Sequence, residues 1–455
     1  MNEALVKQIA DAVLLQMRGA AGSGIYADMN GAIAAARQAA PVMRAMSLAA
    51  RERVIAEIRS TLRANAAALA ALGVEETGMG RVDHKVLKHN LVADKTPGTE
   101  DLSTAAWSGD NGLTLVEQGP FGVIGAVTPC TNPSETVFCN SIGMLAAGNV
   151  VVFNPHPNAV KTSNFAVKLI NAAVHKAGGP REAVFSVEQP TLAAAETMFK
   201  SPAVSLLVAT GGPGVVTAIL SSGKRGIGAG AGNPPVLVDE TADVENAAAA
   251  IVNGCAFDNN LPCIAEKEVV AVAAVYEKLL AAMVKAGAYL AAPDVVERLS
   301  KTVFTEKGLS RACVGRSARV LLEKVGVKVG DDIRCIVFPA PADHVLVQEE
   351  LMMPILGVVK AADFDEALRL CVQMEHGNRH SAHIHSKNVD RLTAYARALD
   401  TAILVKNAPS YAAIGFGGEG FTTFTIASRT GEGLTSAKTF TKSRRCTLGD
   451  GLCIR

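Results

Sequence analysis

Segments rich in β-branched residues alternate with helical segments from Leu113 onward. The strand-like runs include LTLVEQGPFGVIGAVTP, AAGNVVVFNPHP, AVFSVE and VSLLVATGG, and the helix-like TSNFAVKLINAAVHKAG and TLAAAETMFKS lie among them. This alternation predicts a parallel sheet with crossover helices, as in nucleotide-binding domains. A second alternating unit follows GIGAGAGNPPVLVDE and includes EVVAVAA, YEKLLAAMVKAG and AILVKN. We therefore expect an α/β fold with two such units.

The two ends of the chain differ from this pattern. Residues 1–18 place apolar side chains at helical spacing, which predicts a short amphipathic helix, and the flexible sequence GAAGSG at 19–24 follows it. This helix could pack on its own protein or dock on another one, and its sequence leaves both alternatives open. At the other end, KTFTKSRRCTL alternates like a strand, and such a terminal strand usually needs a partner.

Composition excludes several classes of function. The 455 residues are 49% apolar, and 44 basic residues nearly balance 43 acidic ones without a basic stripe. We therefore expect no nucleic acid partner. No apolar run reaches the roughly 18 residues that span a bilayer, so no membrane partner is expected either. Nine cysteines without CxxC pairs favour reduced thiols and a cytoplasmic protein.

Cys263 lies in a turn that resembles a reactive site more than an element interior. The sequence FDNNLPCIAEKEVVAV places Pro262 before it and the polar residues Asp258, Asn259 and Asn260 upstream. A single cysteine is more often a buried filler, but catalytic thiols need access, and a shaped turn can give it. Cys263 is therefore a candidate nucleophile.

Two further patterns suggest ligands. The strand VSLLVAT ends in the loop Thr210-Gly211-Gly212-Pro213-Gly214 before a helix, where small residues let a phosphate approach free backbone N–H groups. Without the full glycine spacing, it could equally be a plain strand-to-helix corner. The histidines of NRHSAHIHS could suggest a metal, but no nearby carboxylate or cysteine completes a site, so we expect no metal.

At FDNNLPCIAEK the sequence resembles the CoA-acylating aldehyde dehydrogenases of bacterial microcompartments, and LPCIAEK is more similar to the propionaldehyde enzymes than to the acetaldehyde ones. Further matching blocks include FGVIGAVTPCTNPSET, TGGPG, GAGAGNPPVLVDETAD, ELMMPILGVVK and TGEGLTSAKTF. The resemblance implies a Rossmann-like NAD-binding domain, an α/β catalytic domain and a small β oligomerisation element. Its expected boundaries are a targeting helix at 1–18, a linker at 19–24, the NAD-binding domain at 25–112 and 121–235, the catalytic domain at 236–428, and the oligomerisation element at 113–120 and 429–455.

The resemblance also implies roles for individual residues. Cys263 would be the nucleophile, and the Asn132 amide would hold the developing oxyanion together with a backbone N–H. Otherwise Asn132 is a turn former before Pro133, and Glu350 is either the carboxylate that holds the nicotinamide ribose or a solvated helix carboxylate. The remaining cofactor contacts are expected from Thr210, Gly211, Gly212 and Gly214 near the pyrophosphate, and from Asn154, Pro155 and His156 near the adenosine ribose.

One departure favours CoA over water as the acyl acceptor. Hydrolytic relatives carry a glutamate before a Gly-Gly pair, whereas this chain has no acid between Lys224 and Asp239, and Ala229 falls near the missing position. A thiol with a pKa of about 8.5 ionises far more readily than water and needs less help from a base. The expected reaction is oxidation of a short-chain aldehyde, with propionaldehyde favoured, to its acyl-CoA with NAD and coenzyme A. The alternatives are a hydrolytic aldehyde dehydrogenase and a non-catalytic scaffold.

The expected partners follow from the same resemblance. The C-terminal strand would cross a subunit boundary in a homo-oligomer, expected as a dimer of dimers. The N-terminal helix resembles an encapsulation peptide that docks shell or cargo proteins, which would place the enzyme in the cytoplasm inside a bacterial microcompartment.

Overall fold

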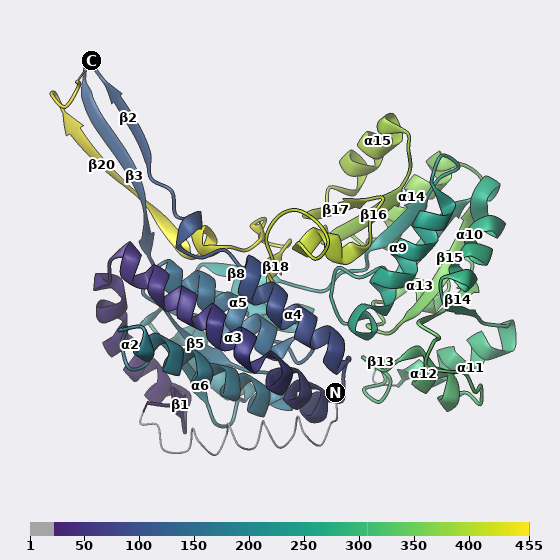
Figure 1. The fold of residues 1–455 in the computed structure, drawn as a ribbon, viewed down its shortest axis with the longest axis horizontal. Helices are drawn as coiled ribbons and strands as arrows, with labels where there is room; N and C mark the ends of the chain where they lie inside the picture. The colour runs from purple at the N-terminus through teal and green to yellow at the C-terminus, as the bar shows by residue number, and fades with distance from the viewer. Residues whose placement is uncertain (1–21, 307, 455) are drawn as a thin grey trace.

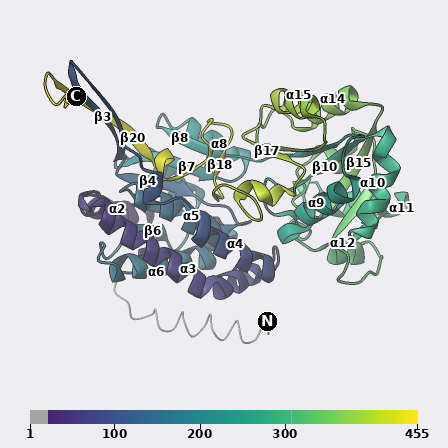
Figure 2. The ribbon, with the colours of Figure 1, turned by 45° about the horizontal axis from the view of Figure 1, so that its top comes forward.

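The computed structural model describes residues 22–306 and 308–454. Two α/β lobes lie side by side, and a β arm projects from the first lobe (Figures 1 and 2). The predicted helix at 1–18 and the first half of the predicted linker, residues 19–21, lie outside the described residues. The α/β alternation predicted from the sequence is confirmed.

The first lobe is built on a parallel sheet of six strands. Its order is β1 (Ile25–Tyr26), β6 (Val184–Val187), β5 (Val150–Asn154), β4 (Val123–Val127), β7 (Val204–Thr210) and β8 (Gly226–Ala229). The central strand β5 is buried along its whole length, as its unbroken apolar run requires in a sheet that is covered on both faces. The helices of this lobe are α2 (Met29–Ala45), α3 (Leu48–Thr77), α4 (Val82–Lys95), α5 (Pro133–Ala146), α6 (Val160–Lys176), α7 (Leu192–Lys200) and α8 (Pro213–Leu220).

The second lobe repeats this plan with seven parallel strands. Their order is β11 (Ala288–Leu290), β14 (Cys335–Pro339), β15 (Ile355–Ala361), β10 (Glu268–Val272), β9 (Pro235–Val238), β16 (Ser381–His385) and β17 (Ile403–Lys406). Its helices are α9 (Val244–Ala256), α10 (Ala273–Lys285), α11 (Pro293–Val303), α12 (Ala318–Lys324), α13 (Val345–Gln348), α14 (Phe364–Met374) and α15 (Val389–Leu399). Two short antiparallel strand pairs lie outside the two large sheets. They are β12 (Phe304–Thr305) with β13 (Gly308–Leu309), and β18 (Ile426–Ala427) with β19 (Gly433–Leu434).

The projecting arm is an antiparallel sheet of three strands, β2 (Ala105–Gly109), β3 (Gly112–Pro120) and β20 (Thr441–Gly449). The expected boundary at residue 113 is wrong for this sheet, because β2 pairs with β3 along its whole length and so belongs to the arm and not to the NAD-binding domain. The short segment AAWSG carries little strand signal of its own, and pairing with β3 makes it a strand. The other domain boundaries remain predictions.

The topology fixes where a ligand site can form. From β4 the chain runs to β5 and β6 on one side, and then returns to place β7 on the other side of β4. In open parallel sheets, ligands bind beyond the carboxyl ends of the strands at such a reversal. Asn132 follows β4 and Thr210 ends β7, so both lie at this point.

Candidate active site

The nucleophile candidate sits after an unusual turn. Asp258, Asn259 and Asn260 all have left-handed backbone angles, with φ of 48°, 54° and 67°. Asp and Asn tolerate this conformation better than most residues, although three in succession cost energy that the surroundings must supply. The Ala265 N–H then donates to the Pro262 carbonyl at 3.0 Å. The turn follows the end of α9, and Cys263 after it is half-buried and lines a cavity.

The cavity beside Cys263 has a volume of ≈ 240 Å³ and lies between the two lobes. Its walls bring together residues that are far apart in the sequence. Seven of the predicted site residues line it: Cys263, Asn132, His156, Thr210, Gly211, Gly212 and Glu350. Ala229, Gly230 and Ala231 also line it, so the segment that lacks an acid does border the cavity.

The electrostatics of Cys263 favour a protonated resting thiol. Burial, together with the nearby Glu350 carboxylate, raises the pKa of the Cys263 thiol to about 12, although Lys267 acts to lower it. The backbone N–H groups of Cys263 and Ile264 also favour the thiolate, but burial outweighs them. The sulfur therefore becomes a strong nucleophile only when its proton is taken up during the reaction.

Asn132 is held from behind by buried charges. It is buried at the start of α5, and its Oδ1 accepts a hydrogen bond from Lys88 Nζ. The same ammonium lies 2.9 Å from Glu135 Oε1 and donates to Asp258 Oδ2 at 2.5 Å. Lys85 completes the group, with its Nζ 3.2 Å from Asp258 Oδ2. These four charged residues (Lys85, Lys88, Glu135 and Asp258) form what we call the buried ion cluster.

Glu135 and Lys88 in the buried ion cluster favour their charged forms although they are shielded from water. Burial raises the pKa of Glu135, but Lys88 and Lys85 outweigh this effect, so the pKa of Glu135 lies well below its usual value. Burial likewise lowers the pKa of Lys88, but Asp258 and Glu135 more than compensate and the pKa of Lys88 is raised. Two ammonium groups face two carboxylates, so the cluster is neutral as a whole. Sequence reasoning missed it because its members lie on segments that are far apart.

Glu350 lies in the coil after α13 and is half-buried, which makes the alternative of a solvated helix carboxylate wrong. Burial raises the pKa of Glu350, although Lys267 and the Gly232 N–H favour its ionised form. A carboxylate at this wall can accept hydrogen bonds from ligand hydroxyl groups.

The loop after β7 has the features that a dinucleotide needs. Thr210 Oγ1 is 2.7 Å from Thr425 Oγ1, which anchors the end of the strand. A Cβ atom at Gly212 would meet nothing within 4 Å, so this part of the cavity wall is open space next to the first turn of α8. The unpaired N–H groups of a first helical turn favour an anion. These residues therefore fit the pyrophosphate of a dinucleotide.

Of the remaining predicted cofactor residues, only one lines the cavity in the described part of the chain. His156 lines the cavity, and its Nδ1 accepts from the Asn158 N–H at 3.1 Å. Asn154 is buried at the end of β5 and its Oδ1 has no partner among the described residues, but Asn154 is not in the cavity lining of the described part, so its role stays a prediction. Pro155 and Gly214 are not in the cavity lining of the described part, and their roles stay predictions.

Comparison with known proteins decides the family. The model of the aldehyde dehydrogenase family matches residues 16–442, nearly the whole chain. The chain belongs to the aldehyde dehydrogenase family. The family predicted from the sequence is thereby confirmed, and with it the fold.

Three relatives within the aldehyde dehydrogenase family narrow the comparison. A propanal dehydrogenase (CoA-propanoylating) of Salmonella typhimurium is 47% identical over 435 residues, covering 95% of this chain and 94% of the relative. The structure of a propionaldehyde dehydrogenase from the Clostridium phytofermentans fucose utilisation bacterial microcompartment matches with a TM-score of 0.94 and 65% identity, over 95% of this chain and 100% of that one. A propionaldehyde dehydrogenase of Rhodopseudomonas palustris, solved with bound CoA and an acylated cysteine, matches with a TM-score of 0.94 and 50% identity, over 96% of this chain and 100% of that one.

Of the three histidines near the second sheet, one reaches this aldehyde dehydrogenase cavity. His380 lines it, and burial lowers the pKa of His380 to about 4. His383 and His385 lie on β16, where His383 Nε2 is 2.9 Å from the Ile264 carbonyl oxygen. Among residues 22–306 and 308–454, no three side chains of His, Cys, Asp or Glu are grouped to hold a metal.

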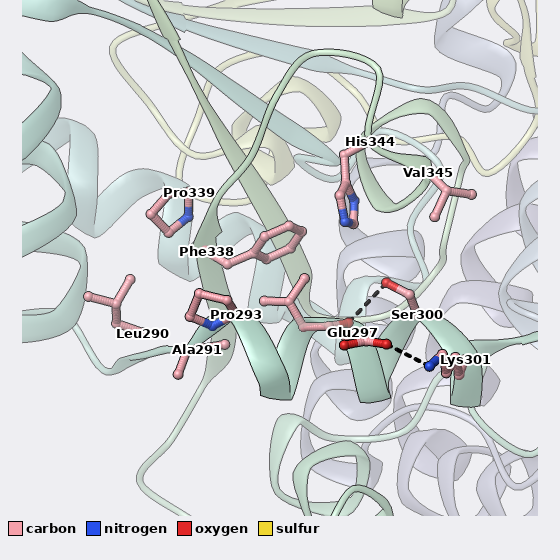
Figure 3. A pocket seen from close by; sticks show the side chains of 12 residues that line it. Leu290, Ala291, Pro293, Glu297, Ser300, Lys301, Phe338, Pro339, His344 and Val345 are labelled. Carbon is pink, nitrogen blue, oxygen red and sulfur yellow. Dashed lines mark hydrogen bonds and ion pairs between the residues drawn. The ribbon is translucent and has the colours of Figure 1, made fainter.

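A larger cavity of ≈ 750 Å³ lies in the second lobe, between α11 and the end of β14 (Figure 3). Its walls are mainly apolar, and its polar side chains are already occupied. Glu297 pairs with Lys301 at 2.6 Å, Ser300 donates to a backbone carbonyl, and the Leu346 N–H donates to His344 Nδ1. No predicted site residue lines this cavity within the described chain, so the chemistry of an aldehyde dehydrogenase does not belong there. In the described part of the chain, no helix combines the length and apolarity that a bilayer crossing requires.

Proposed function

We propose that this protein oxidises a short-chain aldehyde, with propionaldehyde favoured, to an acyl-CoA, with NAD as the hydride acceptor. The observation that carries this proposal is the cavity that joins Cys263 and Asn132 to the loop after β7, with no carboxylate on its 229–231 wall. The names of the relatives, CoA-propanoylating and propionaldehyde dehydrogenases, support the same reaction. A cavity of ≈ 240 Å³ suits a small aldehyde beside a flat ring.

The chain's own residues would act in order. The Cys263 sulfur forms a bond to the aldehyde carbon while its proton leaves, and the Asn132 amide N–H groups stabilise the negative oxygen. Bound NAD supplies the hydride acceptor, which leaves a thioester on Cys263. The thiol of CoA then attacks this thioester, so that the acyl group moves to the CoA sulfur and Cys263 is regenerated. The sum is aldehyde, NAD⁺ and CoA thiol giving acyl-CoA, NADH and one proton.

Product analysis tests the proposed acceptor. With propionaldehyde and NAD, we expect NADH and propionyl-CoA in equal amounts when CoA is present, and little more than one NADH per site when it is absent. Steady formation of propionic acid at the same rate without CoA would instead show a hydrolytic enzyme. Cys263→Ala should abolish NADH formation while leaving the melting temperature nearly unchanged. Retained turnover in this variant would reject the role of Cys263.

The arm supports a homo-oligomer, which we propose to be a dimer of dimers. Trp107 on β2 is 58% exposed and Leu448 on β20 is 46% exposed, although the arm has little apolar core of its own. Both β2 and β20 are edge strands of the arm, and an edge strand can pair with a strand of another chain. Deletion of residues 441–455 should reduce the mass in solution to that of a smaller species, as measured by light scattering. An unchanged mass would reject the arm as the interface.

We also propose that residues 1–18 bind shell or cargo proteins and place the enzyme inside a bacterial microcompartment in the cytoplasm. The amphipathic spacing of this segment and the microcompartment origin of one relative support this. A chain that lacks residues 1–18 should keep its activity but no longer purify together with shells. Continued association with shells would reject the segment as the docking element.

A further inference from the structure

Lys88 on α4 occupies a special place in the buried ion cluster. Its side chain is fully buried (0% exposed) and its Nζ contacts three groups: Asn132 Oδ1, Glu135 Oε1 and Asp258 Oδ2. It does not line the cavity in the described part of the chain. Lys88 therefore cannot meet the substrate directly, but it touches a residue that does.

The contact with Lys88 fixes the orientation of the Asn132 amide. An ammonium group is only a donor, so the amide must present its oxygen to Lys88. A flipped amide would place two donors against each other in a buried site, which is costly. The amide NH₂ group is thus left at the other end, where its one hydrogen bond within the described residues is a long one of 3.4 Å to Thr131 Oγ1. Lys88 consequently decides which end of Asn132 can reach into the cavity.

The same ammonium group also holds the turn that carries the nucleophile. Asp258 opens the three-residue left-handed turn that leads to Cys263, and its other oxygen, Oδ1, accepts from the Arg81 N–H at 2.8 Å. Lys88 therefore connects the oxyanion donor of the first lobe to the nucleophile segment of the second.

We propose that Lys88 is a positioning residue that orients Asn132 for oxyanion stabilisation and fixes its place relative to the Cys263 turn. This inference rests on the proposed function, in which Asn132 stabilises the oxyanion. A displacement of about 1 Å at a reacting group can cost about a hundredfold in rate. Loss of Lys88 should therefore lower kcat, while KM changes little because the cavity lining stays the same.

If Lys88 only neutralised the buried carboxylates, another lysine that does the same should matter equally for kcat. Lys85 is the natural control because it is equally buried and shares both carboxylates, at 3.2 Å from Asp258 and 3.8 Å from Glu135. In the described structure, its further bond is to the Thr131 carbonyl oxygen and not to the Asn132 side chain. A neutralising role would thus make the two lysines equivalent.

The experiment keeps the cluster neutral by removing one anion with each cation. The variants Lys88→Met/Glu135→Gln and Lys85→Met/Glu135→Gln are each made with Asn132 and with Asn132→Ala. For each full-length enzyme, kcat and KM for propionaldehyde are measured with saturating NAD and CoA. Melting temperature and alkylation of Cys263 show that the proteins are folded.

With Asn132 present, we expect kcat of the Lys88 variant to be about tenfold to a hundredfold lower than that of the Lys85 variant, with similar KM values. With Asn132→Ala, the two should have equal kcat. Equal kcat values in the presence of Asn132 would overturn the proposal, and so would a difference that persists after Asn132→Ala. If Asn132→Ala alone leaves kcat unchanged, the proposed function of Asn132 itself is wrong, and the inference fails with it.

A second variant keeps the test decisive if methionine at position 88 prevents folding. Lys88→Gln/Glu135→Gln retains an N–H donor for Asn132 Oδ1 without a charge. We expect its kcat to lie below that of Lys85→Met/Glu135→Gln, and this kcat advantage of the Lys85 variant to vanish with Asn132→Ala. A kcat advantage that survives the loss of Asn132 would again overturn the proposal.

Discussion

Buried ionisable groups lie on both sides of the active-site cavity, but the two sides treat them differently. Behind Asn132, the buried ion cluster places each carboxylate next to an ammonium group, which favours the charged forms of Glu135 and Lys88. On the opposite side lies a group that we call the Cys263 wall: Cys263 and Glu350, which line the cavity, and the buried residues Glu266, Lys267 and Glu268, which follow Cys263 in the chain and do not line it in the described part. There burial raises the pKa of the thiol and of all three carboxyl groups and lowers the pKa of Lys267.

The two sides differ in which charge state burial and neighbouring charges favour, and this difference suggests separate roles for them. In the buried ion cluster, the pKa of Lys88 is raised and that of Glu135 is lowered, so both favour their charged forms and we expect the cluster to hold geometry. Groups in the Cys263 wall favour their neutral forms, and Glu268 has no hydrogen bond to either carboxyl oxygen among the described residues. Groups whose pKa has moved toward neutrality can accept and release protons during a reaction. We therefore expect the buried ion cluster to hold position and the carboxyl groups of the Cys263 wall to take part in proton transfer.

The largest effect should come from the same substitution made on each side. Glu135→Gln leaves two buried ammonium groups facing one carboxylate, and the loss of one partner of a buried pair costs about 3 to 5 kcal/mol in the free energy of unfolding. Glu268→Gln replaces a carboxyl group whose burial raises its pKa and favours the uncharged form, so we expect a loss of about 1 kcal/mol or less. Urea unfolding at pH 7, followed by circular dichroism, measures both. Equal losses would show that the two sides do not differ in charge.

The pH dependence of stability gives the next largest effect, through Glu266. Burial raises the pKa of Glu266 to about 7, although Ser410 donates two hydrogen bonds to it. Because this pKa is raised on folding, its stabilisation is complete below about pH 4.5 and is lost as the pH rises through about 7, a change on the order of 3 kcal/mol. In Glu266→Gln, the urea concentration at the midpoint of unfolding should change much less between pH 5 and pH 8 than it does in the unmodified protein.

Glu135→Gln is the matched control for this slope. The pKa of Glu135 is lowered, so this carboxylate stays ionised over the whole range and its removal should leave the pH dependence intact. If the pH dependence of the unfolding midpoint disappeared in Glu135→Gln and persisted in Glu266→Gln, Glu135 and not Glu266 would be the carboxyl group that titrates between pH 5 and pH 8.

The sequence predicted the candidate reactive residues of the site better than it predicted the buried residues that hold them in place. The turn before Cys263 was predictable because Asp and Asn tolerate left-handed angles, and proline breaks the regular structure after them. The alternation of strands and helices predicted the parallel sheets, whereas the reversal of strand order beside Asn132 came only from the structure. The buried ion cluster was not predictable: Lys88 and Asp258 are 170 positions apart and Lys88 and Asn132 are 44 apart, and lysine at helical spacing on α4 normally indicates a solvated face. Only the packed structure shows that these lysines point inward.

The smallest effect concerns the Cys263 wall alone. Glu350 raises the pKa of the Cys263 thiol, so Glu350→Gln should lower that pKa and increase the thiolate fraction. Each unit of pKa changes this fraction about tenfold, and we expect iodoacetamide to alkylate Cys263 about threefold to tenfold faster at pH 9, as measured by mass spectrometry of its peptide. The exposed neighbour Glu349→Gln is the control and should leave the rate unchanged. A slower reaction in Glu350→Gln would mean that this carboxylate takes the proton from the thiol and does not oppose its loss, and the wall would then contain its own base.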